Sequence, residues 1–216
     1  MNHLSGVDRL ANRFRVMRHG QSKANEAGVI VSRIETDRRG DFGLSELGVR
    51  QARTAAAACG LPADTVICSS DFSRARQTAR IVRDCLGAEA VIIAAGLRER
   101  CFGDLEGSPV GNYARVWAAD EAARGQAENG QAENGQAHSA HIHRGVESAA
   151  AVLDRATAVV ADLERRYAGR DILLVSHGDT LQILQTGFLR LDPSGHRRLP
   201  HLGTAEIREL RLSREP

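Results

Sequence analysis

The chain of 216 residues has no long hydrophobic run, few aromatic residues, one tryptophan and little net charge. No apolar stretch approaches the roughly 18 residues of a membrane-spanning helix, so we expect no transmembrane segment. Residues 1–14 carry charges without an apolar stretch, so they do not resemble a secretory signal. A formal net charge of +2 is too small to indicate a nucleic acid or an anionic membrane as a partner. We therefore expect a cytoplasmic protein with neither partner.

The four cysteines match neither a metal motif nor a disulfide framework. Cys59, Cys68, Cys85 and Cys101 are widely spaced, and none belongs to a CxxC pair. Free thiols in a reducing compartment are the simpler interpretation, which agrees with a place in the cytoplasm.

Short β-branched runs alternate with longer helical patterns, which predicts a largely parallel α/β sheet. Strands are expected at residues 14–17, 65–68, 91–93 and 172–175, with a half-exposed edge strand at 206–212. Helices are expected over 45–58, over about 14 residues that end at Gly87, and over 146–167. We predict a three-layer α/β/α domain over residues 13–216 with a mostly parallel sheet and an antiparallel edge strand. Residues 1–12 are expected to be an N-terminal extension.

A low-complexity segment interrupts this pattern. Residues 126–137 read QAENGQAENGQA, and a polar repeat of period five matches neither a helix nor a strand. We expect a flexible loop at about 124–143 without a role in the chemistry. His138, His141 and His143 follow the repeat but have no cysteine or carboxylate at zinc-site spacing. A solvated loop is the simpler interpretation, with metal binding or a place at the substrate entrance as alternatives.

Charged residues and histidines follow the ends of the predicted strands. Two His-Gly dipeptides, at 19–20 and 177–178, each come directly after a strand. Arg74 lies in the first turn of a helix, where backbone amides favour an anion. Since ligands of parallel sheets bind outside the carboxyl ends of the strands, these side chains are expected to share one crevice. The sequence thus predicts an anion pocket with a proton donor, made by Arg18, His19, Arg74, Glu99 and His177.

Taken singly, several of these residues have simpler interpretations. Arg74 and Arg76 could be ordinary arginines of a helix surface. Glu99 could belong to a solvated charge cluster over residues 98–100. Glu106 is expected to order the turn after the third strand and to have no chemical role.

Ordered motifs strengthen the functional interpretation. They read RHGQS at residues 18–22 with Asn25, LSxxGxxQA at 44–52, SSxxxRAxQTA at 69–79, ExxxGxxEG at 99–107, GxES at 145–148 and VSHG at 175–178. Together they resemble the motifs of the histidine phosphatase superfamily, in the branch that includes cofactor-dependent phosphoglycerate mutases. The resemblance is collinear from about residue 14 to residue 212 and implies a phosphoglycerate-mutase-like fold.

The resemblance also implies roles for individual residues. His19 matches the family's nucleophile, which becomes phosphohistidine, and Glu99 matches the proton donor. Because phosphoryl transfer consists mostly of positioning and charge stabilisation, arginine side chains can supply the positive charge and no metal is expected. The phosphate or substrate contacts that the resemblance implies are Arg18, Asn25, Ser32, Arg74, His177 and Gly178.

Departures from the family pattern favour a hydrolase over a mutase. Ala24 stands where many members carry an aromatic residue, and the chain has no lysine besides Lys23. Much of the segment between Glu99 and His177 is the repeat, which leaves little for an organised lid. We therefore predict a metal-independent phosphomonoesterase that acts on a small phosphorylated metabolite without a cofactor.

Two other functions stay open from the sequence. A phosphoglycerate mutase would share the first chemical step and would require 2,3-bisphosphoglycerate. A non-catalytic phospho-ligand binding protein is a remote alternative, because the nucleophile and the acid are both present. Substrate contacts are expected in residues 26–43 and 104–145. The sequence does not define the oligomeric state, and a dimer is possible.

Overall fold

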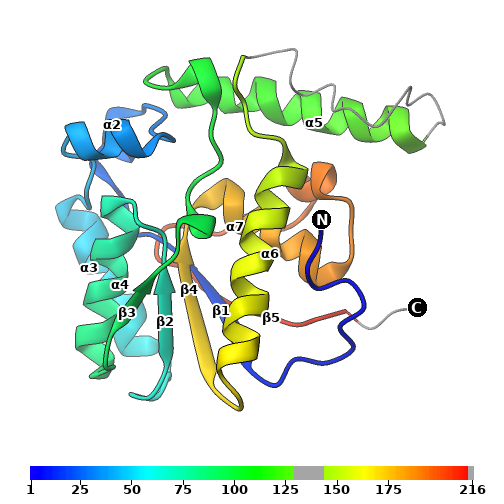
Figure 1. Cartoon of the computed structure of the whole chain (residues 1–216). Coiled ribbons are helices and arrows are strands. Elements are labelled where there is room, and N and C mark those ends of the chain that lie inside the picture. Colours follow the sequence, from blue (N-terminus) through cyan, green and yellow to red (C-terminus); the bar gives the residue numbers. More distant parts are fainter. Residues whose placement is uncertain (129–143, 214–216) are drawn as a thin grey trace.

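The computed structural model describes residues 1–128 and 144–213 (Figure 1). Its sheet contains β1 (Arg13–Arg18), β2 (Val66–Ser69), β3 (Val91–Ile93), β4 (Asp171–Ser176) and β5 (Ile207–Leu210). The strand order is β3-β2-β4-β1-β5, in which β5 runs antiparallel to β1 and the other pairs are parallel. The predicted mostly parallel sheet with an antiparallel edge strand is confirmed.

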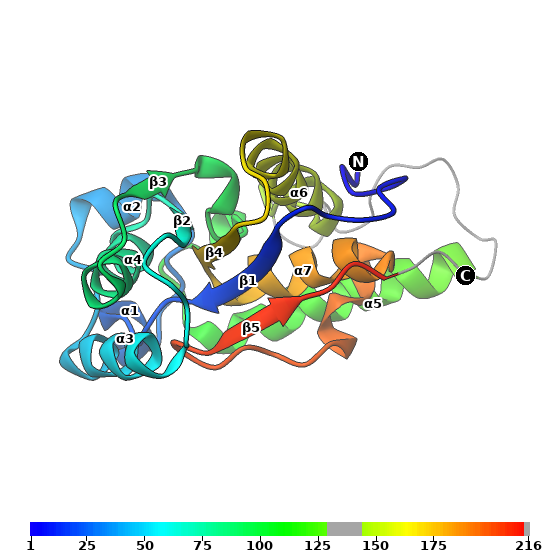
Figure 2. The same cartoon turned by 90° about the horizontal axis from the view of Figure 1, so that it is seen from below.

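Helices cover both faces of this sheet (Figure 2). One face packs against α3 (Glu46–Ala58) and α4 (Ser73–Leu86), and the other against α6 (Ala149–Arg166) and α7 (Gly178–Leu189). All six residues of the central strand β4 are buried, since both of its faces are covered. The remaining α-helices of the described residues are α1 (Lys23–Ala27), α2 (Ile34–Arg39) and α5 (Tyr113–Glu128).

Capping residues explain where the predicted helices begin and end. The Ser45 side chain accepts a hydrogen bond from the Gly48 amide at the start of α3, and Gly87 ends α4 with a left-handed φ of 70°. Helix α6 begins later than the expected residue 146, because the Ser148 side chain accepts the Ala151 amide and so marks the cap. Val146 instead forms a β-bridge with Phe102.

Helix α7 was not predicted, and its environment explains why. Eleven of its residues, from Gly178 to Phe188, are buried, so the segment lacks the polar stripe that produces a helical period in a sequence. Helices α1 and α2 are only 5 and 6 residues long and lie largely in a stretch that reads as a loop. None of the described helices is both long enough and apolar enough to span a bilayer.

Two boundaries differ in detail from the prediction. Residues 1–12 precede β1, but Leu4 is only 1% exposed and belongs to the main apolar core. Helix α5 continues to Glu128, so residues 124–128 are helical and the predicted loop at 124–143 begins too early. Alanine, glutamate and arginine favour a helix, which explains this continuation. His138, His141 and His143 lie outside the described residues.

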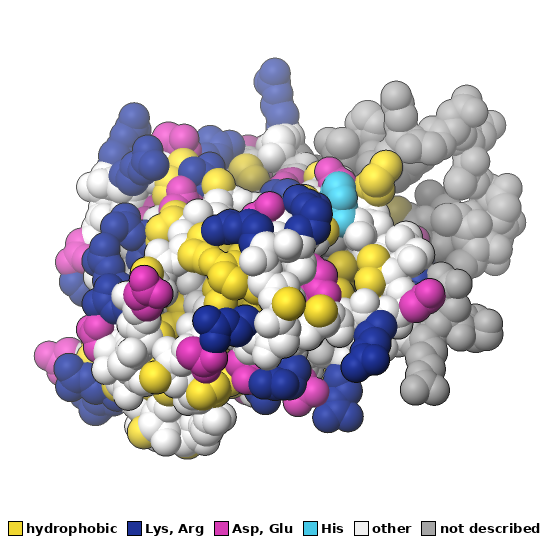
Figure 3. Space-filling model, turned by 60° about the horizontal axis from the view of Figure 1, so that its bottom comes forward, with side chains coloured by type: hydrophobic (Ala, Val, Ile, Leu, Met, Phe, Trp, Pro, Cys, Tyr) yellow, Lys and Arg dark blue, Asp and Glu magenta, His cyan; other side chains and the backbone are white. Residues whose placement is uncertain are grey.

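The face of the molecule in Figure 3 carries interspersed basic and acidic side chains around a small apolar area.

Candidate active site

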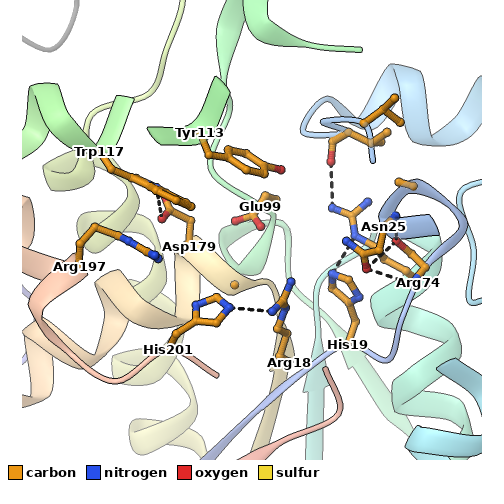
Figure 4. A pocket seen from close by; sticks show the side chains of 15 residues that line it. Arg18, His19, Asn25, Arg74, Glu99, Tyr113, Trp117, Asp179, Arg197 and His201 are labelled. Atoms are coloured by element: carbon orange, nitrogen blue, oxygen red, sulfur yellow. Dashed lines mark hydrogen bonds between the residues drawn. The ribbon is translucent and has the colours of Figure 1, made fainter. Parts of the chain in front are cut away.

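The site lies at the carboxyl ends of the parallel strands, below helix α5 (Figure 1). A cavity of about 150 Å³ opens there, and Figure 4 shows its side chains pointing toward one another. The sequence-predicted residues that line it are Arg18, His19, Asn25, Arg74, Glu99 and Gly178. His177 lies next to them, with its ring centroid 5.2 Å from that of His19. The roles assigned to these residues stay predictions.

The geometry of His19 defines which ring nitrogen carries the proton. Its Nδ1 lies 2.7 Å from the Gly20 carbonyl oxygen, which only accepts, so Nδ1 carries the proton. Nε2 therefore holds the lone pair, and Arg74 Nε donates to it at 3.1 Å. Burial first, and then the positive charges of Arg74 and Arg18, lower the pKa of His19 well below its usual value. The imidazole is thus neutral and buried, with its lone pair on Nε2.

A close backbone contact holds this histidine in place. A Cβ atom on Gly20 would lie 2.4 Å from the Gly48 carbonyl oxygen, so only glycine fits after His19. The Gly20 amide donates to Thr78 Oγ1 at 3.1 Å, which links the end of β1 to helix α4. The left-handed Ala205 (φ 60°) donates its amide to the Arg18 carbonyl oxygen at 3.0 Å.

Three buried nitrogen atoms beside His19 have no hydrogen-bond partner among the described residues. They are Arg18 Nε, Arg74 Nη1 and His177 Nδ1. His177 Nε2 lies 2.9 Å from Ser70 Oγ, and a neutral His177 with its proton on Nδ1 would accept from that hydroxyl. Unpaired buried donors cost free energy, and an anion would satisfy the two arginine nitrogens. The pocket is therefore built for a negatively charged group.

Helix α2, which the sequence did not predict, positions one of these arginines. Asp37 on α2 accepts hydrogen bonds at 2.8 Å from the Ser73 amide and from the Ser73 hydroxyl, at the start of α4. Its Oδ1 lies 3.8 Å from Arg74 Nη1. Arg74 Nη2 donates to the Val31 carbonyl oxygen at 2.9 Å, so both ends of the guanidinium are held. Arg76 is exposed, as expected.

Glu99 is buried at the wall of the pocket. Its Oε1 accepts from the backbone amides of Arg100 at 2.9 Å and Thr180 at 3.2 Å. Burial first, and then the nearby charge of Asp179, raise the pKa of the Glu99 carboxyl group. Burial also acts to raise the pKa of Asp179, but hydrogen bonds from His196 and Arg100 lower it to about 2. The two carboxyl groups therefore differ, with Asp179 ionised and Glu99 able to hold a proton.

Helix α5 supplies two pocket residues that the sequence analysis missed. Tyr113 and Trp117 line the cavity, and their rings stack with centroids 5.4 Å apart. The expectation that little is left for an organised lid was wrong, because α5 covers the site. In the sequence these two aromatic residues are four positions apart, a spacing that places both on one face of a helix and was the available signal for them. Arg197 and His201 also line the pocket, from a segment after α7 that has no periodic pattern.

A fully buried arginine fixes α5 above the pocket. Arg100 binds Asp120 of α5 through two hydrogen bonds of 2.6 and 2.9 Å and lies 3.3 Å from Asp179. We expect Arg100→Met to lower the free energy of unfolding by about 3 kcal/mol, since it leaves two buried carboxylates without their cation. Urea unfolding measures this change. Arg211→Met, at an exposed pair with Glu209, is the matched control and should change stability by less than about 0.5 kcal/mol. Equal effects of the two substitutions would contradict the structural role of Arg100.

Ser32 is a predicted contact that the structure does not bring into the pocket. Its Oγ donates to Glu106 Oε2 at 2.5 Å and accepts the Phe102 amide at 3.0 Å. Glu106 also accepts the Ser32 and Arg33 amides, which agrees with its expected role in ordering a turn. Ser32 lines a neighbouring cavity instead. The described residues contain no cluster of His, Cys, Asp and Glu side chains that could hold a metal ion.

The chain is similar over most of its length to proteins of one superfamily. The sequence model of the Histidine phosphatase superfamily (branch 1) matches residues 14–215. A metal-independent phosphoserine phosphatase of Arabidopsis thaliana is 28% identical over 181 residues, which are 83% of this chain and 70% of that protein. A protein of Yersinia pestis named probable phosphoglycerate mutase GpmB is 32% identical over 184 residues, which are 85% of this chain and 78% of that protein.

A mycobacterial protein is similar in both sequence and structure. The glucosyl-3-phosphoglycerate phosphatase of Mycobacterium tuberculosis is 29% identical over 208 residues, which are 93% of this chain and 85% of that protein. A solved structure of mycobacterial glucosyl-3-phosphoglycerate phosphatase superposes with a TM-score of 0.68 at 28% identity. The superposition covers 91% of this chain and 88% of that one.

Proposed function

The chain belongs to the Histidine phosphatase superfamily (branch 1), and we propose that this phosphoric monoester hydrolase acts without a metal, through a phosphohistidine on His19. The main support is geometric: His19 Nε2 lies where Arg18 and Arg74 present unpaired donors, with the His177 ring beside them. A phosphoryl group bound there has its oxygens on those donors and its phosphorus beside the nucleophile.

In the first step His19 Nε2 attacks phosphorus while the ester oxygen leaves. The nitrogen–phosphorus bond forms and the phosphorus–oxygen bond breaks. Arg18 and Arg74 carry fixed positive charges to the phosphoryl oxygens, which stabilises the transition state. The protonated Glu99 gives its proton to the departing alkoxide.

In the second step water replaces the histidine at phosphorus. Glu99, now a carboxylate, removes a proton from the attacking water, and the nitrogen–phosphorus bond breaks. Inorganic phosphate leaves, and His19 returns to its neutral form. Dividing hydrolysis into two displacements avoids direct attack of water on the phosphate dianion.

Metal independence follows from the side chains that would replace the metal. Two arginines and the His177 N–H supply the charge stabilisation that a divalent cation supplies elsewhere. We expect release of phosphate from p-nitrophenyl phosphate in the presence of EDTA at the rate seen without it. A loss of activity in EDTA that added Mg²⁺ or Zn²⁺ restores would contradict this proposal.

A phosphoglycerate mutase is the second candidate, favoured by the similarity to the Yersinia protein. A mutase returns the phosphoryl group to a substrate hydroxyl, whereas a hydrolase gives it to water. The two phosphatase-named relatives favour the hydrolase. Interconversion of 2- and 3-phosphoglycerate in the presence of 2,3-bisphosphoglycerate, faster than phosphate release, would establish the mutase instead.

We also propose that the substrate is a small phosphorylated metabolite and that the protein works in the cytoplasm. The small cavity and the names of the relatives support the first point. Cys59, Cys68, Cys85 and Cys101 are all free thiols, which is typical of a reducing compartment and supports the second.

A further inference from the structure

A histidine from the segment between α7 and β5 contacts one of the two arginines beside His19. Figure 4 shows His201 and Arg18 side by side at the pocket, joined by a hydrogen bond. Arg18 Nη1 donates to His201 Nε2 at 2.8 Å and to the Leu202 carbonyl oxygen at 3.0 Å. Both contacts of this arginine nitrogen therefore come from two consecutive residues of one segment.

These contacts leave a particular edge of the Arg18 guanidinium available. An arginine can hold two oxygen atoms of one anion through Nε and Nη2, which lie on the same edge of the group. Arg98 holds the two carboxylate oxygens of Asp71 in this way, at 2.9 and 2.6 Å. In Arg18 the Nε atom is buried without a hydrogen-bond partner among the described residues. The Nη1 contacts thus fix the guanidinium with its Nε–Nη2 edge available to an anion.

The hydrogen bond with Arg18 requires a neutral His201. A guanidinium nitrogen only donates, so His201 Nε2 accepts and the ring proton is on Nδ1. Burial first, and then the charges of Arg18 and Arg197, lower the pKa of His201, whereas Asp179 and Glu206 act in the opposite sense. The ring is therefore neutral near pH 7, and it offers Arg18 a lone pair rather than a second positive charge.

The backbone around His201 is held without the help of its side chain. Arg208 on β5 donates to the carbonyl oxygens of Pro200 at 2.7 Å and of His201 at 3.1 Å. Gln182 on α7 donates to the Leu199 carbonyl oxygen at 2.6 Å. A substitution that changes only the side chain at position 201 therefore leaves the path of this segment in place.

We propose that His201 is a positioning residue, which orients Arg18 through this hydrogen bond so that the Nε–Nη2 edge meets the phosphoryl group. The inference rests on the proposed function, which assigns the phosphoryl group to the donors beside His19. Gly178 provides the space for the pair, because a Cβ atom there would lie 3.3 Å from His201 Cε1 and 3.4 Å from Arg18 Nε. In this arrangement His201 acts on the substrate only through Arg18.

Two substitutions of similar size separate the hydrogen bond from the bulk of the side chain. In His201→Gln the amide oxygen can accept from Arg18, whereas in His201→Leu no acceptor remains. We expect His201→Leu to lower kcat/KM for p-nitrophenyl phosphate by about 5- to 30-fold and to weaken the binding of inorganic phosphate by a similar factor. His201→Gln should stay within about 3-fold of the wild type in both measurements. Both variants should keep Tm within about 2 °C of the wild type, because the backbone contacts remain.

A double-mutant cycle tests whether His201 acts through Arg18. In an Arg18→Met background the hydrogen bond is already lost, so His201→Leu should change kcat/KM by less than about 2-fold. The same substitution in the wild-type background should have its full effect. This coupling distinguishes a positioning residue from a side chain that contacts the substrate directly.

Three outcomes would overturn the role of His201. One is wild-type activity and phosphate affinity in His201→Leu, another is an equal loss in His201→Leu and His201→Gln, and the third is an undiminished effect of His201→Leu in the Arg18→Met background. In each case continued hydrolysis of p-nitrophenyl phosphate by the wild type would leave the proposed function intact. Absence of hydrolysis in the wild type would contradict that function itself, while phosphate affinity, measured by calorimetry, would still test His201.

Discussion

Replacement of His19 by alanine is expected to lower kcat/KM for p-nitrophenyl phosphate by about 10⁴-fold or more. The variant loses the ring nitrogen beside Arg18 and Arg74 that accepts the phosphoryl group in the proposed first step, so that group has no nitrogen to which it can transfer. Water would then have to attack the phosphate directly, without the covalent intermediate. Steady-state kinetics with a sensitivity of 10⁻⁵ of the wild-type rate would measure the loss.

Two controls separate loss of the nucleophile from loss of the fold. His3→Ala removes a histidine that pairs with Asp154 far from the pocket, and it should retain wild-type turnover. The His19→Ala protein should still bind inorganic phosphate, because Arg18, Arg74 and His177 remain. If His19→Ala keeps more than about a tenth of the activity while folded, His19 is not the nucleophile.

Replacement of Glu99 by glutamine should have the second largest effect, and its size should depend on the leaving group. For an alkyl phosphate such as O-phosphoserine we expect kcat to fall by about 10²- to 10⁴-fold, because the alkoxide must leave without a proton. The loss should be smaller for p-nitrophenyl phosphate, whose phenolate needs little protonation. Glu46→Gln, at an exposed position on α3, is the matched control and should be neutral.

The pH profile tests the same residue with a definite sign. Burial and Asp179 raise the pKa of Glu99, so its acid form persists to higher pH than that of an ordinary glutamate. Turnover of O-phosphoserine should therefore decline as pH rises through this raised pKa, and Glu99→Gln should lack that alkaline limb. The pKa of His19 is well below its usual value, so the ring stays neutral in mildly acidic solution. The acid limb of the profile, where His19 becomes protonated, should therefore lie at low pH. An alkaline limb that persists unchanged in Glu99→Gln would assign the proton donor elsewhere.

The sequence could predict the center of the site because that part depends on short motifs at strand ends. Arg18, His19 and His177 follow strands whose apolar runs are easy to recognise, and parallel strands bring their carboxyl ends to one edge of the sheet. The same reasoning placed Glu99 and Arg74 correctly. These positions need only the order of the strands along the chain.

The periphery of the site could not be predicted, for physical reasons that differ between residues. Tyr113 and Trp117 lie on a helix that runs into the polar repeat, so the repeat obscured its pattern. Arg197 follows helix α7, and its place at the pocket depends on where that helix lies. Nearly all residues of α7 are buried, so its sequence has no amphipathic period. Ser32 was placed with the substrate contacts, but Glu106 Oε2 accepts from both its hydroxyl and its backbone amide and holds it outside the pocket.

The most direct test of the account is detection of the phosphorylated histidine itself. Wild-type protein mixed with excess O-phosphoserine is stopped in alkali, in which phosphohistidine survives, and its peptides are analysed by mass spectrometry. We expect one phosphoryl group on the peptide that contains His19, bound at Nε2, since Nδ1 is committed to the Gly20 carbonyl oxygen. In Glu99→Gln the adduct formed from p-nitrophenyl phosphate should accumulate, because no carboxylate removes a proton from the attacking water. Rapid hydrolysis with no phosphoryl group on His19, or with one on another residue, would contradict the account.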